Sequence, residues 1–233
     1  DYDKCIEACN KVLECGKYSM ETVRKNVFVT NNENSKEIIF ALPFDETYVT
    51  DWNAFDFHMY SLQPENQATY NFKATPWGGA CVIPQYIESF DPDDQRLKDD
   101  FISGPQYDKN GGVLYCTMGN MKGKPLDYVN KVNSIDDSDE NQGWRWGKFE
   151  YAEGITNRLS NDFPLLRYAD VYLMKAEALL RTEHADEAAE LVTKVRERNF
   201  TEHPAKAIVT GEQLQETSCY DYGRRDNVKS THD

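Results

Sequence analysis

The sequence has no apolar run long enough to cross a membrane, and it has few basic residues for its length. Its 233 residues include 26 Lys and Arg against 40 Asp and Glu, which gives a formal net charge of −14. Binding to nucleic acid requires clustered Lys and Arg to neutralise phosphates, so this charge disfavours nucleic acid as a partner. The same repulsion disfavours an anionic membrane surface. A spanning helix needs about 20 apolar residues in succession, and the sequence does not supply them.

Signatures of catalysis and metal binding are also missing. The sequence contains no GxSxG or HExxH motif, and its six cysteines include no CxxC pair. The acid-rich stretch DPDDQR (91–96) has Arg96 where a calcium-binding EF-hand loop needs glycine, so a helix start is the favoured interpretation. We therefore expect neither an enzyme nor a cofactor or metal site. A disulfide between Cys81 and Cys116 stays open.

Helical periodicity is present near the N-terminus. Apolar residues recur there at the spacing of one helix face, at Tyr2, Cys5, Ile6, Cys9, Val12 and Leu13. Gly16 then offers a stop, because glycine adopts a left-handed conformation at low cost. The chain begins inside this helical pattern, which predicts that it is a fragment. The segment SKEIIFALPF (35–44) predicts a short extended stretch, which Pro43 interrupts.

A second periodic region lies at 161–200. The segment FPLL predicts an extended lead-in, because Pro164 cannot continue a helix backwards. Two apolar stripes follow, at positions 169–180 and 185–195, and the short link TEH between them requires antiparallel helices. Such a helical hairpin is typical of tetratricopeptide arrays. Between about 45 and 160 regular periodicity fades, with only brief helices predicted at 84–90 and 93–102, and a stretch of this kind usually carries binding loops.

Four segments, in this order along the chain, resemble the SusD/RagB family. They are YDKCIEACNKVLECGKYSM, NNENSKEIIFAL, SFDPDDQRLKDDF, and NDFPLLRYADVYLMKAEALL followed by ADEAAELVTKVRERN. The resemblance implies a mainly α-helical, SusD-like fold of tetratricopeptide-like hairpins with a long irregular, loop-rich insert. It also implies that an N-terminal part and the extreme C-terminus of a longer protein are missing. We expect a scaffold helix and extended segment at 1–44, the ligand-binding insert at 45–160, the helical hairpin at 161–200 and an irregular segment at 201–233.

The function that the resemblance implies is nutrient uptake. Members of this family are outer-membrane, cell-surface lipoproteins that bind glycans or other nutrients and pass them to a TonB-dependent, SusC-like transporter. We therefore expect an oligosaccharide or similar nutrient as the ligand and that transporter as the partner. Contact with the membrane would come only through a lipid anchor that this chain does not contain. The alternative is a tetratricopeptide-type scaffold that holds a protein partner and has no small-molecule ligand of its own.

Aromatic loops are the strongest candidates for the ligand site. Sugars stack their flat C–H faces on aromatic rings and need polar groups for their hydroxyls, and TDWNAFDFHMY (50–60) and YNFKATPWGGA (70–80) have that composition. Gly78 and Gly79 remove side chains that could cover Trp77, although a packed loop aromatic is an equal interpretation. We predict a surface made by Trp77, Trp52, Tyr70, Asn53, Asn71 and His58. In GWRWGKFEY (143–151), strand-like alternation predicts Trp144 and Trp146 on one face, packed against the helices.

Overall fold

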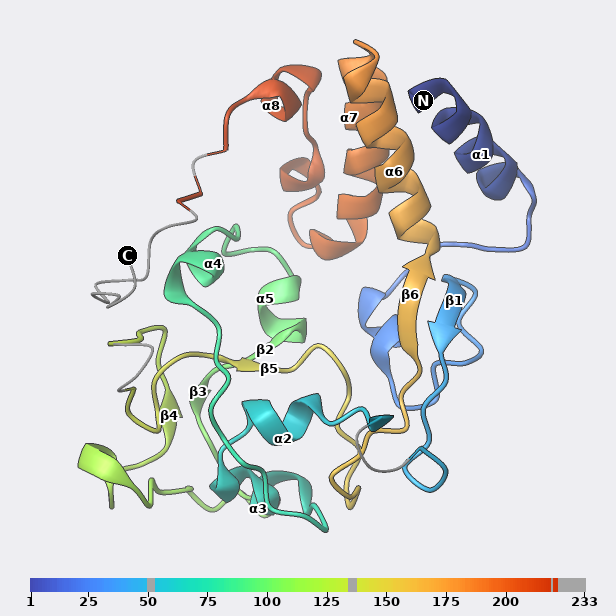
Figure 1. The fold of residues 1–233 in the computed structure, drawn as a ribbon. Helices are drawn as coiled ribbons and strands as arrows, with labels where there is room; N and C mark the ends of the chain where they lie inside the picture. Colours follow the sequence, from blue (N-terminus) through green and yellow to red (C-terminus); the bar gives the residue numbers. More distant parts are fainter. Residues whose placement is uncertain (50–52, 134–137, 219, 222–233) are drawn as a thin grey trace. The chain divides into compact units, whose positions relative to one another are not determined.

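The computed structural model describes residues 1–49, 53–133, 138–218 and 220–221, and the chain divides into two compact units (Figure 1). The first unit combines Asp1–Pro43 and Asn161–Cys219 with the short segment Asp93–Gln95. The second combines Phe44–Pro92 and Arg96–Ser160 with Tyr220–Asp233. Among the described residues, every helix is too short or too polar to span a lipid bilayer.

The first unit is mainly helical. In chain order it contains α1 (Tyr2–Glu14), β1 (Ile38–Leu42), β6 (Phe163–Arg167), α6 (Tyr168–Arg181), α7 (Ala185–Arg196) and α8 (Gly211–Gln215). Short 3₁₀ helices at Arg24–Phe28, Glu197–Asn199 and Pro204–Ala207 connect them. Helix α6 packs against both α1 and α7, and all three lie side by side in Figure 1. The prediction of a mainly α-helical fold with a helical hairpin near the C-terminus is confirmed.

Small residues hold this hairpin together. Ala176 and Ala188 are buried at the contact between α6 and α7, and Leu179 packs beside them. Alanine has no side chain beyond Cβ, so the two helix backbones can approach closely while Leu179 fills the remaining space. Ile6 of helix α1 also packs against this cluster. The apolar stripes seen in the sequence are therefore the buried faces of these helices.

The extended lead-in before α6 is strand β6, which pairs with β1 in an antiparallel ribbon. Its register joins Leu42 to Phe163 and Ile38 to Arg167, with irregularities between. Arg167 is also the N-cap of α6: its backbone N–H donates to the carboxylate of Asp170 at 2.7 Å. The strand and the helix thus meet without a loop, because one residue ends the first and caps the second.

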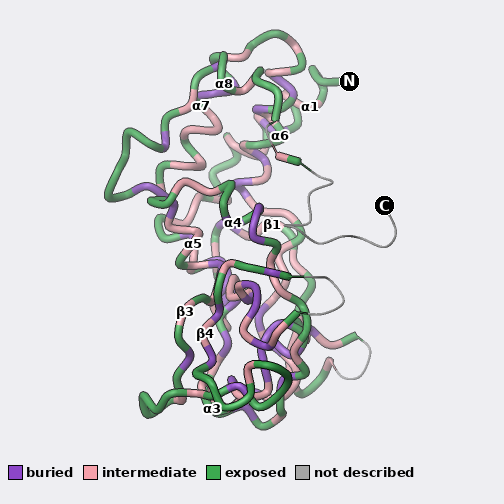
Figure 2. Tube along the Cα trace, turned by 90° about the vertical axis from the view of Figure 1, so that its left-hand side faces the viewer, coloured by how far each residue is buried: buried purple, intermediate pink, exposed green. Residues whose placement is uncertain are grey.

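The second unit is built from short elements. They are α2 (Phe57–Ser61), α3 (Gln67–Tyr70), α4 (Pro84–Glu88), α5 (Arg96–Asp99), β2 (Phe101–Ile102), β3 (Gly104–Pro105), β4 (Asp127–Tyr128) and β5 (Arg145–Trp146), with 3₁₀ turns at Pro64–Asn66 and Gly119–Met121. Strand β2 pairs with β5, and β3 pairs with β4. The brief helix predicted at 84–90 corresponds to α4, whereas of the stretch 93–102 only Arg96–Asp99 is helical and Phe101–Ile102 forms strand β2. Figure 2 shows buried stretches alternating with exposed turns along this unit.

This unit is more compact than the sequence indicates. Cys116, Leu126 and Tyr128 form one buried cluster. A second group of buried rings centres on Phe55, whose ring lies 4.7 Å from that of Phe149. The segment therefore has its own hydrophobic core despite its low periodicity, because its contacts join residues far apart in sequence. Cys81 and Cys116 are both free thiols.

Candidate functional site

Trp77 lies on the surface of the second unit as one half of an aromatic pair. Its side chain is 51% exposed, and Tyr60 of α2 is 50% exposed. The two rings meet edge to face, with centroids 4.8 Å apart and an angle of 79° between their planes. This contact fixes the orientation of the indole while half of its area stays open to solvent. A fixed, open ring is what stacking against the C–H face of a sugar requires.

The segment after Trp77 is held against α2 by backbone hydrogen bonds. The N–H groups of Trp77 and Gly78 donate to carbonyls at the C-terminal end of α2, at 2.7 Å and 2.9 Å. Gly78 and Gly79 both have positive φ, and a Cβ at Gly78 would meet the Gln63 side chain at 2.7 Å. Glycine is thus needed for the backbone conformation and for the close approach to Gln63.

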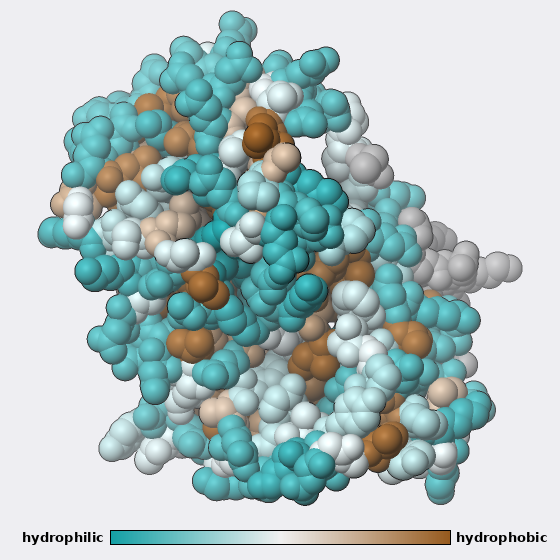
Figure 3. Space-filling model, turned by 180° about the vertical axis from the view of Figure 1, so that it is seen from behind, coloured by the Kyte–Doolittle hydropathy of each residue, from teal (hydrophilic) through white to brown (hydrophobic). Residues whose placement is uncertain are grey.

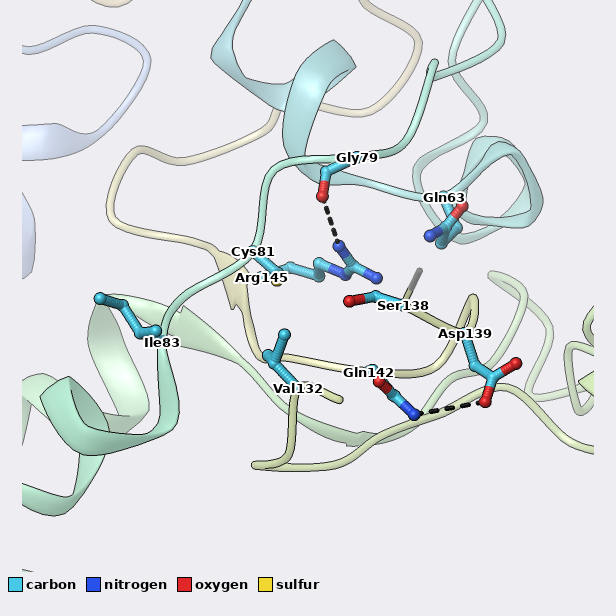
Figure 4. Close-up of a pocket in the computed structure, with 9 residues that line it drawn as sticks. All are labelled: Gln63, Gly79, Cys81, Ile83, Val132, Ser138, Asp139, Gln142 and Arg145. Atoms are coloured by element: carbon cyan, nitrogen blue, oxygen red, sulfur yellow. Dashed lines mark hydrogen bonds between the residues drawn. The ribbon is translucent and has the colours of Figure 1, made fainter. Parts of the chain in front are cut away.

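A cavity of about 300 Å³ opens beside this segment (Figure 4). Its lining residues come from three stretches that are far apart in sequence: Gln63, Gly79, Cys81, Ile83, Val132, Ser138, Asp139, Gln142 and Arg145. Gly79 is two residues after Trp77, so one segment carries both a wall residue of the cavity and the exposed indole. Polar side chains cover one part of the wall, whereas Ile83 and Val132 make another part apolar.

Arg145 of β5 lies in the wall of this cavity and is only 2% exposed. Its Nη1 donates to the carbonyls of Gly79 and Ala80 at 3.5 Å and 3.3 Å, and its Nη2 donates to the carbonyl of Glu140 at 2.9 Å. The guanidinium also lies 4.8 Å from the centre of the Tyr128 ring. Its Nε is buried without a hydrogen-bond partner. The side chain therefore ties β5 to the glycine segment through neutral acceptors.

The acidic groups nearest in sequence are directed elsewhere. The carboxylate of Glu140 accepts hydrogen bonds from the backbone N–H groups of Thr117 and Met118, at 3.0 Å and 2.9 Å. Asp139 points away from Arg145 and accepts a hydrogen bond from Gln142 (Figure 4). Burial raises the pKa of the Cys81 thiol, although the charge of Arg145 opposes that shift. Cys81 is thus a neutral thiol at neutral pH.

The predicted site residues do not all lie together. Trp52 lies outside the described residues, and Asn53, the next residue along, is exposed. Asn71 is exposed at the C-terminal end of α3, where it adopts a left-handed conformation with φ 53°. Its Nδ2 donates to Glu153 at 3.5 Å.

His58 belongs to the core, and Tyr70 is half-buried in an aromatic cluster rather than in an open loop. The His58 side chain is fully buried in α2, and its Nε2 lies 3.1 Å from the carbonyl oxygen of Thr156. The Tyr70 ring stacks on Phe72 with centroids 4.9 Å apart and also meets Tyr151 edge to face. Sequence periodicity missed both helices because each has only about one turn. We leave His58 out of the proposed ligand surface because no ligand can reach its ring in this structure.

Two features of the cavity were missed at the sequence level. Alternation along GWRWGKFEY places Arg145 on the face opposite Trp144 and Trp146, and that signal could have marked it as an inward-pointing arginine. Both tryptophan rings contact Phe101 in the paired strand, with centroids 6.4 Å and 6.2 Å away, and the backbone N–H of Trp146 donates to Ser61 of helix α2 at 2.7 Å. Gln63 gave no sequence signal, because its place in the wall depends on a distant segment.

A second, wider hollow of about 600 Å³ includes Asn71. It is lined by Pro64, Glu65, Gln67, Ala68, Asn71, Phe72, Val113, Leu114 and Tyr115, and the Tyr115 side chain is 53% exposed. This hollow is shallow and open to solvent. On the face shown in Figure 3, hydrophobic residues form separate small patches on a mostly hydrophilic surface.

Comparison with known proteins identifies the fold. A family model described as the SusD family matches residues 36–216. A SusD superfamily protein from Parabacteroides distasonis has a similar structure, with TM-score 0.60 and 17% identity over 88% of this chain and 43% of that one. Surface glycan-binding protein A from Bacteroides thetaiotaomicron matches with TM-score 0.61 and 16% identity, over 85% and 42%. The same protein in complex with laminarihexaose matches with TM-score 0.60 and 14% identity, over 88% and 46%.

The TM-scores show a shared fold, and the chain spans less than half the length of each of the three structures. No curated protein sequence matches it. The family model, in contrast, covers most of the chain, including the strand β1, the second unit up to Ser160 and the helical hairpin. The chain belongs to the SusD family.

Proposed function

We propose that this chain is the ligand-binding part of a cell-surface protein of the outer membrane that binds an oligosaccharide or a similar nutrient without turning it over. The observation that carries the proposal is the half-exposed Trp77, which Tyr60 holds in place beside a cavity with polar and apolar walls. Membership in the SusD family supports it, as does a fold shared with surface glycan-binding proteins. Trp77 is the main stacking platform, and Asn53, Asn71, Tyr70 and Trp52 stay as further candidate contacts.

Calorimetry of the full-length protein against a panel of neutral oligosaccharides tests this proposal. Laminarihexaose, cellohexaose and maltohexaose are suitable probes. We expect saturable binding of at least one of them, with the glycan recovered intact by chromatography after incubation. No binding at millimolar glycan would instead favour the alternative, a tetratricopeptide-type scaffold for a protein partner. Shortened products would contradict the non-catalytic part of the proposal.

We also propose that the bound nutrient passes to a TonB-dependent transporter of the SusC type. Family membership supports this step. Gentle detergent extraction of outer membranes, followed by affinity purification of the tagged full-length protein, should recover such a transporter in comparable amount. Recovery of the tagged protein alone would contradict delivery and would leave glycan binding untouched.

A further inference from the structure

Arg145 places a positive charge inside the protein without a carboxylate partner among the described residues. The side chain is 2% exposed, and each of its three hydrogen bonds goes to a backbone carbonyl. Within the described residues no carboxylate forms an ion pair with it. A buried charge is costly unless an opposite charge or a full set of hydrogen bonds compensates it, and here the Nε–H has no partner. The charge therefore favours an anionic group in the cavity that Arg145 lines.

The protein's own groups do not fill that role. The carboxylate of Glu140 is bound by two backbone N–H groups, and only its carbonyl oxygen reaches Arg145. Asp139 lies on another part of the wall and pairs with the amide of Gln142 (Figure 4). The thiol of Cys81 is protonated at neutral pH, because burial raises its pKa.

We infer that the cavity holds one sugar residue that carries a carboxylate, such as a uronic acid, with Arg145 as the partner of that carboxylate. This inference rests on the proposed function and assigns its substrate class. In any arginine the Nε–H and one Nη hydrogen lie on the same edge of the planar guanidinium, and among the described residues the Nε–H of Arg145 has no hydrogen-bond partner. That pair of donors matches the two oxygens of a carboxylate, which bind arginine in a parallel, bidentate arrangement.

The size and lining of the cavity fit one residue of a sugar chain. Its volume of about 300 Å³ lies at the lower end of the range for ligand pockets, which extends from about 300 to 1,000 Å³. Gln63, Ser138 and Gln142 bring polar atoms that suit ring hydroxyls. Ile83 and Val132 provide an apolar wall for the C–H face of the ring. The next sugar along the chain would then lie toward Trp77, which follows from the position of Gly79 at the rim.

The test compares an acidic sugar with its own neutral ester. The full-length protein is titrated with D-glucuronate, with D-glucuronate methyl ester and with D-glucose, and binding is followed by NMR. We expect glucuronate to bind about tenfold or more tightly than the ester, because a charge-assisted bidentate pair is lost on esterification. The Nε–H resonance of Arg145 should shift with glucuronate and stay unchanged with the ester. Equal affinity for acid and ester, or an unchanged Arg145 resonance, would overturn the inference.

Three variants sharpen the test. Arg145→Lys keeps the positive charge but removes the two parallel N–H donors of the guanidinium, so glucuronate should bind about tenfold more weakly. Asp139→Asn removes a negative charge from the wall, so glucuronate should bind more tightly while the ester is unaffected. Lys73→Gln removes an exposed positive charge elsewhere in the unit and serves as the control. Circular dichroism checks folding, and the comparison of acid with ester stands on the unaltered protein if Arg145→Lys does not fold.

The outcomes separate the inference from the proposed function. If neutral oligosaccharides bind in a way that depends on Trp77, while glucuronate and its ester bind equally weakly, the substrate class is wrong and glycan binding stands. If neither neutral nor acidic sugars bind, both proposals fail. Arg145 is then a structural clamp on the carbonyls of Gly79, Ala80 and Glu140.

Discussion

The carboxylate of Glu37 is fully buried and is bound by the guanidinium of Arg198, which lies 161 residues further along the chain. Arg198 Nη2 donates to Oε1 at 2.9 Å, and Nη1 donates to Oε2. Arg167 adds a third contact at 3.3 Å. This cluster joins the N-terminal part of the first unit to both ends of the helical hairpin, because Arg167 precedes α6 and Arg198 follows α7.

Glu37→Gln should therefore destabilise the protein strongly. The change leaves the buried Arg198 without its counter-charge and Arg167 with Asp170 alone, and removing one partner of a buried pair costs about 3 to 5 kcal/mol. Urea denaturation measures the loss. The matched control is Glu177→Gln, which breaks the exposed pair with Arg181 and should cost less than about 1 kcal/mol. An equal loss of unfolding free energy in the two variants would contradict the claim that the buried ion pair stabilises the protein more than the exposed one.

The buried imidazole of His58 predicts that stability falls with acidity. Burial lowers its pKa to about 4, against an ordinary value of 6.5, although the contact with the Thr156 carbonyl opposes the shift. The unfolded chain then binds a proton between those two values while the folded protein does not. Stability contributed by this difference is complete above pH 6.5 and is lost as the pH falls toward 4, by about 3 kcal/mol at most.

His58→Phe removes this titration and keeps an aromatic ring at the site. Urea midpoints at pH 7.5, 6.0 and 4.5 should fall more steeply for the unaltered protein than for the variant. The carboxylates titrate in both proteins, so their contribution cancels in the difference. Parallel pH profiles would contradict a neutral, buried His58.

Gly143→Ala should destabilise the second unit. Gly143 has a φ of +76°, and a Cβ there would lie 2.5 Å from the Cβ and Sγ atoms of Cys81. Gly154→Ala is the matched control, because Gly154 has a φ of +77° and nothing within 4 Å of the added Cβ. The control should cost about 1 kcal/mol from backbone strain alone, and Gly143→Ala clearly more. Thermal denaturation of both variants measures the difference, and similar losses would contradict the tight contact with Cys81.

Trp77→Ala should weaken binding of a neutral oligosaccharide about tenfold or more. Losing an aromatic platform at a contact costs about 1 to 3 kcal/mol. Helical content and melting temperature should change little, because the indole is half exposed. Tyr48→Ala removes a ring that is 85% exposed and should leave binding unchanged. Normal binding by Trp77→Ala, or a loss that follows from unfolding, would place the site elsewhere.

The sequence by itself determined the helical framework. The stripes through Cys9 and Ala176 have the 3.6-residue period of a helix that buries one face, and Pro164 placed an extended segment before α6. These signals are local, because a helix is held by bonds between residues four apart. The four ordered motifs, three of them in this framework, were enough to indicate the family.

The tertiary structure alone decided what the second unit presents to a ligand. One-turn helices such as α2 carry too few residues for a periodic signal, so His58 and Tyr70 were predicted in open loops although they lie in a packed aromatic core. The neighbourhood of Arg145 depends on the carbonyls of Gly79 and Ala80, more than 60 residues earlier. The pattern of apolar residues in a sequence shows the periodicity of a helix or strand. Which side chains are buried, and which line a cavity, depends instead on contacts between segments that are far apart in the sequence.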